Sequence, residues 1–276
     1  MTQSKKLDQF YTAPDVAKKY YILAKKKFKT VGLRFDAEIE PSAGDGAFFK
    51  LMPPASRIGL DLEPKYRGVQ KKDFFDFFWW QFDFQKLFGK KILVVGNPPF
   101  GKNASLAIKF FNKAGEFATA IAFIVPRSFQ KISVQNKLNF NFKLIFEEVL
   151  PLKSFVFDSK PYNVPCVFQI WIRNGHPRQK KVFDLNNNFF IFTTKDDADI
   201  AVRRVGGTAG KATCHIEKAA KVSHYFLKLK TGINREKFVE TINAIDFSAV
   251  RDATAGPRSI SKGEFVAEFL KSEEVT

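Results

Sequence analysis

The sequence has 276 residues, with 45 Lys or Arg and 28 Asp or Glu, so its formal net charge is +17 at pH 7. That length suits one large domain, or an average domain followed by a smaller one. Hydrophobic residues make up 45% and charged residues 26%, which is typical of a folded globular protein and excludes a disordered chain. Cys166 and Cys214 are too few for a disulfide framework or a four-cysteine zinc site.

The charge is unevenly distributed along the chain. Residues 1–35 and 175–235 each carry a net charge of +7, and residues 36–174 carry +6 over a much longer stretch. This excess predicts a polyanionic partner, and nucleic acid is favoured over a membrane surface. No stretch approaches the ~18 apolar residues of a membrane span, and the first residues lack the apolar segment of a secretory signal. We therefore expect an intracellular, cytoplasmic protein without a membrane partner.

Between residues 36 and 174, short apolar runs alternate with segments long enough for crossover helices. We expect strands at 37–39, 57–62, 91–95, 120–125, 144–150 and 166–172, and a helix at 105–117. This alternation predicts an α/β fold with a doubly wound, mostly parallel sheet.

The pattern breaks at residues 174–177, which read NGHP and are typical of a turn. We place the domain boundary there, giving a first domain of residues 1–174 and a second of residues 175–276. The second has no clear βαβ unit, and we expect two helices near 234–245 and 261–271. Ser261 followed by Glu264 predicts a capping box at the start of the later helix.

Residues 40–48 read EPSAGDGAF and directly follow an expected strand. Gly44 and Gly46 allow close approach of the backbone to a ligand, at the position where α/β sheets bind nucleotides, although a plain tight turn has the same pattern. Asp61 follows Gly44 by 17 residues, near the ~20-residue spacing at which an acid binds ribose hydroxyls. The loop lacks the lysine of a P-loop and the third glycine of a dinucleotide fingerprint. An acidic loop suits a cationic nucleoside, and S-adenosylmethionine, a sulfonium, is such a ligand.

Residues 97–100 read NPPF and end the strand expected at 91–95. The two prolines have a fixed φ and no N–H to donate. Asn97 offers a side-chain oxygen and Pro98 a carbonyl oxygen, so two acceptors lie side by side near Phe100. An isolated motif of this kind also fits a rigid turn, but its place after a glycine loop and an acidic strand end favours a binding site.

Together these motifs resemble those of the class I S-adenosylmethionine-dependent adenine-N6 DNA methyltransferases, in the motif order of the gamma group, over most of residues 7–173. Residues 9–12, QFYT, are similar to the element that closes over the methionine end of the cofactor, with Ala13 as an extra residue before Pro14. The resemblance implies a Rossmann-like, doubly wound methyltransferase sheet and a small C-terminal α+β target-recognition domain.

The resemblance also implies which residues form the site. The implied cofactor-binding residues are Tyr11, Thr12, Glu40, Pro41, Ser42, Gly44, Gly46, Phe48, Asp61, Leu62, Asp73, Phe74 and Asn97. The implied catalytic residues are Asn97, Pro98 and Phe100, and the aromatic rings implied to stack on the target base are those of Phe100 and Phe157.

The implied mechanism is direct transfer. Asn97 and the Pro98 carbonyl each accept a hydrogen bond from one of the two N–H groups of the adenine amine, so that its lone pair localises toward the sulfonium methyl. The base has to leave its stack to reach them. No metal is required, and His176, His215 and His224 have no companion ligands at suitable spacing.

Basic residues beside flexible glycines predict contacts with nucleic-acid phosphates, although a solvated loop would have the same composition. The residues predicted to bind nucleic acid are Lys102, Arg203, Arg204, Lys211 and Arg258.

The favoured function is a site-specific DNA adenine-N6 methyltransferase, as a monomer or weak dimer. An RNA adenine-N6 methyltransferase is the nearest alternative, because Phe rather than Tyr at the position of Phe100 is common among RNA-modifying relatives, but the QFYT element and the C-terminal domain favour DNA. A glutamine-N5 protein methyltransferase shares the Asn-Pro-Pro element and gives no reason for the charge. A catalytically inactive nucleic-acid-binding subunit would not need both the cofactor loop and Asn97.

Overall fold

A computed structural model describes residues 10–77, 89–157, 159–254 and 256–273. The chain divides into two compact units, residues 1–180 and 181–276, each of which is described by itself. The predicted boundary at residue 174 falls directly after the last strand of the first unit.

The first unit is built on a sheet with the strand order β4-β3-β2-β5-β6-β10-β7. The strands are β2 (Ala37–Glu40), β3 (Arg57–Asp61), β4 (Gln70–Lys71), β5 (Ile92–Gly96), β6 (Ala120–Pro126), β7 (Phe142–Val149) and β10 (Cys166–Arg173). All neighbours pair in parallel except β10, which runs antiparallel to both β6 and β7. This is a doubly wound Rossmann-like order with one reversed strand inserted beside the last, as in the expected methyltransferase sheet.

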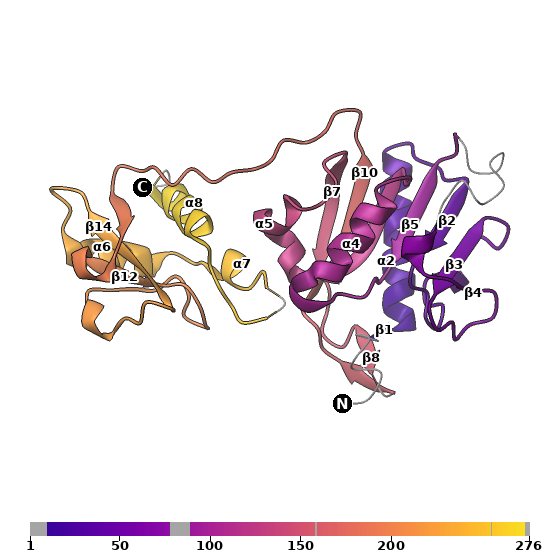
Figure 1. Ribbon diagram of the computed structural model, residues 1–276, viewed down its shortest axis with the longest axis horizontal. Coiled ribbons are helices and arrows are strands. Elements are labelled where there is room, and N and C mark those ends of the chain that lie inside the picture. Colours follow the sequence, from indigo (N-terminus) through magenta and orange to yellow (C-terminus); the bar gives the residue numbers. More distant parts are fainter. Residues whose placement is uncertain (1–9, 78–88, 158, 255, 274–276) are drawn as a thin grey trace. The chain divides into compact units, whose positions relative to one another are not determined.

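Helices cover both faces of this sheet (Figure 1). Leu93 and Val95 of β5 pack in one apolar cluster with helix α2 (Pro14–Thr30), while Ile92 and Val94 pack in the other with α4 (Ser105–Ala114). Because successive strand residues point to opposite faces, a strand covered on both sides is apolar throughout. The continuous apolar runs of the sequence follow from this burial.

A second, smaller sheet brings distant segments of the first unit together. Its strands are β1 (Tyr11–Thr12), β8 (Phe155–Phe157) and β9 (Lys160–Tyr162), in the order β1-β8-β9. Tyr11 pairs with Val156 and Thr12 with Phe155. The start of the described chain is therefore held against the hairpin that carries Phe157.

The second unit is an α+β domain with its own apolar core. Its antiparallel sheet has the order β11-β14-β12-β13, formed by β11 (Phe190–Thr193), β12 (Ile200–Arg203), β13 (Ala212–Thr213) and β14 (His224–Leu229). Its helices are α6 (Arg235–Ala244), α7 (Ser248–Arg251) and α8 (Lys262–Glu273).

The remaining short helices connect these elements. They are α5 (Ile132–Gln135) and the 3₁₀ segments η1 (Phe49–Leu51), η2 (Phe74–Asp76), η4 (Lys102–Ala104), η5 (Arg127–Gln130), η6 (Lys195–Asp197) and η7 (Ile216–Lys218).

The expected strands agree with the observed ones to within two residues at either end. The helix expected at 105–117 is shorter, because it ends at Ala114 and the chain turns at Gly115. The capping box is confirmed: the Glu264 carboxylate accepts the Ser261 N–H at 2.8 Å, and the Ser261 hydroxyl accepts the Glu264 N–H at 3.2 Å. None of the described helices combines the length and the apolar character needed to cross a membrane.

Candidate active site

A cavity of about 540 Å³ lies at the carboxyl ends of β2, β3 and β5. Its size is in the usual range for small-molecule sites, about 300–1,000 Å³. Most of the residues predicted for the cofactor and for catalysis line it: Tyr11, Thr12, Glu40, Pro41, Ser42, Gly44, Asp61, Leu62, Asp73, Phe74, Asn97, Pro98, Phe100 and Lys102. The chain therefore gathers at one edge of the sheet residues that are up to ninety positions apart in sequence.

The loop after β2 requires glycine at position 44. Gly44 has φ +50°, and a Cβ added to it would lie 2.9 Å from Cε1 of Tyr11, closer than carbon atoms pack. The Tyr11 ring therefore covers the loop directly. Only glycine combines this backbone conformation with so close an approach.

Asp61 holds this loop in place from the neighbouring strand. Its Oδ2 accepts the Gly44 N–H at 2.7 Å, and its Oδ1 accepts the Glu63 N–H at 2.8 Å. Each carboxylate oxygen can accept a further hydrogen bond. Asp61 can therefore bind two adjacent hydroxyl groups of a ligand without giving up its contacts with the loop.

Glu40 is a buried carboxylic acid at the floor of the cavity. Its side chain is 2% exposed, and its Oε2 accepts the Phe49 N–H at 2.6 Å. Burial raises the pKa of the Glu40 carboxyl well above its usual range, against the opposing effect of the backbone hydrogen bonds from Phe49 and Phe48, and the nearby charges of Asp45 and Asp61 add to the rise. Folding therefore favours the protonated form of Glu40.

This raised pKa predicts a dependence of stability on pH. The contribution of Glu40 to the free energy of unfolding is fully present below its unfolded pKa, near 4.5. As the pH rises toward the folded pKa, this contribution is lost at about 1.4 kcal/mol per pH unit. Glu40→Gln keeps an acceptor oxygen for Phe49 and removes the titration. We expect urea unfolding at a series of pH values to show a smaller decline for E40Q than for the wild type. E116Q, at an exposed carboxylate paired with Lys113, is the control, and its stability should decline with rising pH as that of the wild type does. Identical pH profiles for E40Q and the wild type would contradict this account.

The orientation of the Asn97 side chain is fixed by a contact with the backbone of Phe10. Its Nδ2 donates to the Phe10 carbonyl at 3.1 Å, which turns Oδ1 the other way. Among the residues that the structure describes, nothing donates a hydrogen bond to the buried Oδ1. A buried acceptor without a donor costs about 1–3 kcal/mol, so this oxygen is suited to a ligand that brings an N–H group.

The aromatic residues of the site have different environments. Phe100 lines the cavity and meets Phe155 edge to face at 6.4 Å between ring centroids. Phe155 is fully buried and has no free face. Phe157 is half-buried and does not line the cavity; its ring lies 5.7 Å from each of the rings of Phe10 and Tyr162. Phe157 thus belongs to an aromatic cluster beside the cavity, formed by Phe10, Phe157 and Tyr162.

Two predicted cofactor residues lie away from the cavity. Phe48 is fully buried in the core beneath α2, because the turn after Gly46 directs its ring into the sheet. Gly46 faces Tyr66, since an added Cβ would lie 3.1 Å from that ring. Phe48 and Gly46 therefore support the conformation of the loop without lining the cavity. Gln9, the first residue of the QFYT element, lies outside the described residues.

The structure also adds residues that the motifs did not indicate. Phe10 supplies the carbonyl that orients Asn97, and Asp45, Glu63 and Lys72 line the cavity. Phe10 lies within the QFYT element, so the sequence motif includes it. The role of its carbonyl was not predictable, because it depends on the pairing of β1 with β8.

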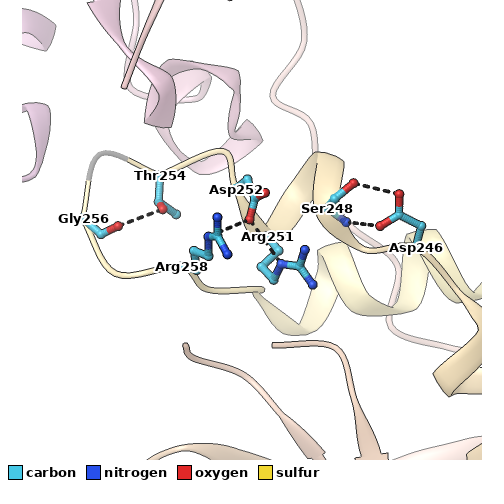
Figure 2. A network of polar contacts seen from close by, with 7 residues as sticks. All are labelled: Asp246, Ser248, Arg251, Asp252, Thr254, Gly256 and Arg258. Atoms are coloured by element: carbon cyan, nitrogen blue, oxygen red, sulfur yellow. Dashed lines mark hydrogen bonds and ion pairs between the residues drawn. The ribbon is translucent and has the colours of Figure 1, made fainter. Parts of the chain in front are cut away.

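The other predicted nucleic-acid residues, Arg203, Arg204, Lys211 and Arg258, belong to the second unit. The Gly206 N–H donates to the Arg258 carbonyl at 2.8 Å, and Val205 forms a bridge with Ser259, so the glycine loop and the turn near Arg258 are neighbours. Figure 2 shows Arg251 and Arg258 converging on Asp252, at 3.2 and 3.1 Å. Arg258 remains 55% exposed, so part of its guanidinium faces solvent. Lys211 is exposed and donates to the Asn243 carbonyl.

In the part of the chain that the structure describes, no group of three or more His, Cys, Asp or Glu side chains is arranged to hold a metal ion.

No protein-family model and no curated protein matches this sequence. Among solved structures, the chain is similar to a proposed RNA methyltransferase from Pyrococcus horikoshii, with 16% identity over 61% of this chain and 88% of that chain, and a TM-score of 0.46. It is also similar to a protein from Thermoplasma acidophilum, with 15% identity over 58% of this chain and 98% of that chain, and a TM-score of 0.38. A third structure, EvdMO1, shares 12% identity over 58% of this chain and 41% of that chain, with a TM-score of 0.33. At these identities the similarity concerns the fold alone. The strand order defines that fold independently of these comparisons.

Proposed function

We propose that the protein is an S-adenosylmethionine-dependent DNA methyltransferase that acts on the exocyclic amine of adenine. The observation that carries the proposal is Asn97: its amide is oriented by the Phe10 carbonyl, and its buried Oδ1 is left without a donor among the described residues. That oxygen belongs to the NPPF segment, at the edge of a cavity that fits a nucleoside.

The cavity fits a cationic cofactor. Besides the protonated Glu40, its ionisable residues are mostly acids, namely Asp45, Asp61, Glu63 and Asp73, against Lys72 and Lys102. Asp61 offers two carboxylate oxygens to ribose hydroxyls, and the Asp73 carboxylate lies beside the backbone of η2, where its Oδ1 accepts the Phe75 N–H at 2.9 Å. When bound, S-adenosylmethionine supplies an electrophilic methyl group on sulfur.

The chain's own residues account for the reactivity of the amine. The lone pair of the adenine amine is delocalised into the ring, which makes the amine a poor nucleophile. Asn97 Oδ1 and the Pro98 carbonyl can each accept a hydrogen bond from one of its two N–H groups, so that the lone pair localises on nitrogen. Acceptors that are already in position need no reorganisation as charge develops, and no strong base is required.

A nucleic-acid substrate is supported by charge and by the aromatic residues. The net charge of +17 favours a polyanion, and a base that leaves its stack needs aromatic or apolar contacts. Phe100 provides one at the cavity, and the cluster of Phe10, Phe157 and Tyr162 lies next to it. DNA is favoured over RNA by the QFYT element and by the separate C-terminal α+β unit.

Transfer of a tritiated methyl group tests this proposal. The protein is incubated with labelled S-adenosylmethionine and, in parallel, with duplex DNA, single-stranded DNA, RNA or protein. We expect label in DNA, and less of it as salt is added, because phosphate contacts weaken with ionic strength. Label in RNA alone, or in protein alone, would contradict the proposal.

A further inference from the structure

The charged groups at the carboxyl edge of the sheet change sign across it. In the order β3-β2-β5-β6, β3 ends in Asp61, and β2 ends in Glu40 and leads into the loop with Asp45. Next along the sheet, β5 leads into Asn97, and β6 leads into Arg127. The acids therefore lie on the side of the proposed cofactor. On the other side of residues 97–100, the acceptor loop, the first charged residue at this edge is Arg127.

Arg127 and Ser128 carry polar atoms that nothing in the described structure satisfies. The Arg127 Nε and the Ser128 Oγ are both buried, and neither has a hydrogen-bond partner among the described residues. None of the ion pairs between described residues involves Arg127. Unsatisfied buried donors are uncommon in folded proteins and call for a partner.

The position of the pair places it next to the acceptor loop. Gly96 of β5 is level with Phe123 of β6, so β6 continues three residues further, alongside the NPPF segment. The Arg127 N–H donates to the Pro165 carbonyl at 3.0 Å, in the segment that leads from the hairpin of Phe157 into β10. The Arg127 backbone therefore lies between β5, the strand that leads into the acceptor loop, and the segment that joins the hairpin to β10, and Arg127 does not line the cofactor cavity.

We propose that Arg127 and Ser128 form an anion site that binds a phosphodiester group of the nucleic acid next to the target nucleotide. This inference rests on the proposed function and identifies the contact that holds the target strand at the site. A guanidinium and a hydroxyl are both donors, and Arg matches the geometry of phosphate oxygens. Nε and Oγ themselves are buried, but both residues are only partly covered, so an anion that approaches from solvent meets the exposed part of each side chain.

A carboxylate ligand would satisfy the same donors, but the setting favours phosphate. The proposed substrate carries a phosphate on each side of every nucleotide, and a base that rotates out of its stack turns about these two phosphates. Holding one of them lowers the cost of keeping the base in the cavity. Phosphate contacts position a nucleic acid without reading its sequence, so this site is expected to act on any substrate that the enzyme accepts.

Kinetics with neutralised phosphates test the site. Arg127→Gln is expected to lower kcat/KM for DNA by about 10-fold, the effect of one lost charge-assisted hydrogen bond, mainly through KM, with an unchanged Kd for S-adenosylmethionine. A DNA substrate with a methylphosphonate beside the target adenine should cost the wild type a similar factor and R127Q much less, since both changes remove the same contact. Arg127→Lys, which keeps the charge, should recover part of the loss.

Lys90→Gln is the matched control. Lys90 is exposed, lies outside the two basic stretches and precedes β5 at the amino edge of the sheet, opposite the site, so the same loss of charge should leave kcat/KM and the response to the methylphosphonate unchanged. If wild-type protein methylates DNA but R127Q has a normal KM, or suffers the full methylphosphonate penalty at every position, the anion site is wrong and the proposed function stands. If wild-type protein transfers no methyl group to any nucleic acid, the proposed function fails, and the anion site with it.

Discussion

Replacing Asn97 with alanine is expected to lower kcat by about 100- to 1,000-fold, the usual cost of removing one preorganised group that stabilises a transition state. The substitution removes the Oδ1 that has no donor in the described structure and the Nδ2 contact that holds it in place. Methyl transfer under single-turnover conditions measures the effect. Cofactor binding, measured by calorimetry, should change little, because the acids and the glycine loop remain.

Asn112→Ala is the matched control for this substitution. The Asn112 side chain also makes defined contacts, donating to the Lys137 carbonyl at 2.9 Å and accepting the Asn139 N–H at 2.7 Å, but it lies on α4, away from the cavity lining. Its loss should lower stability and leave kcat unchanged. Wild-type kcat in N97A would remove Asn97 from the mechanism.

The second large effect is expected at Asp61. Replacing Asp61 with alanine removes two carboxylate oxygens that support Gly44 and Glu63 and that face the proposed ribose. Hydrogen bonds to a charged group contribute about 1.5–3 kcal/mol each, and the loss of the ribose contacts should raise the Kd of S-adenosylmethionine about 100-fold. Isothermal titration calorimetry measures this directly.

Asp36→Ala separates cofactor binding from general destabilisation. The Asp36 Oδ2 also accepts a backbone hydrogen bond, from Lys91 at 2.8 Å, but at the amino edge of the sheet. D36A should lose a comparable backbone contact and keep the wild-type Kd. An unchanged Kd in D61A would show that Asp61 does not bind the cofactor.

The central parallel strands β5 and β6 were predictable because each is apolar over its whole length. Burial by α2 on one face and α4 on the other leaves β5 and β6 no polar positions, so their ends could be placed almost to the residue. The reversed direction of β10 was not predictable, because a strand buried on both faces has the same sequence pattern whichever way it runs.

The site was predictable where it follows the strand ends and not where it depends on distant pairing. Glu40, Asp61 and Asn97 end or follow strands, and the carboxyl ends of parallel strands meet at one edge. By contrast, the orientation of Asn97 depends on Phe10, which the pairing of Tyr11 with Val156 brings into place. Phe48 shows the reverse case: its motif predicts a cofactor contact, but its ring is buried in the core.

Arg127 was not predicted as a site residue, because it belongs to none of the motifs. The sequence around it, VPRS, follows a buried strand at the same edge as the other site residues, and this was the available signal. Its lack of a partner is a property of the folded environment, since Nε is buried without a partner among the described residues only once the chain has packed around it.

The identity of the methylated atom tests the central claim most directly. Duplex DNA treated with the protein and S-adenosylmethionine is digested to nucleosides, and the products are identified by mass spectrometry against the same reaction with N97A. The proposed arrangement of Asn97, Pro98 and Phe100 predicts N6-methyladenine as the product of the wild type and its near absence with N97A. A methyl group on a ring carbon, on the sugar or on cytosine would contradict it.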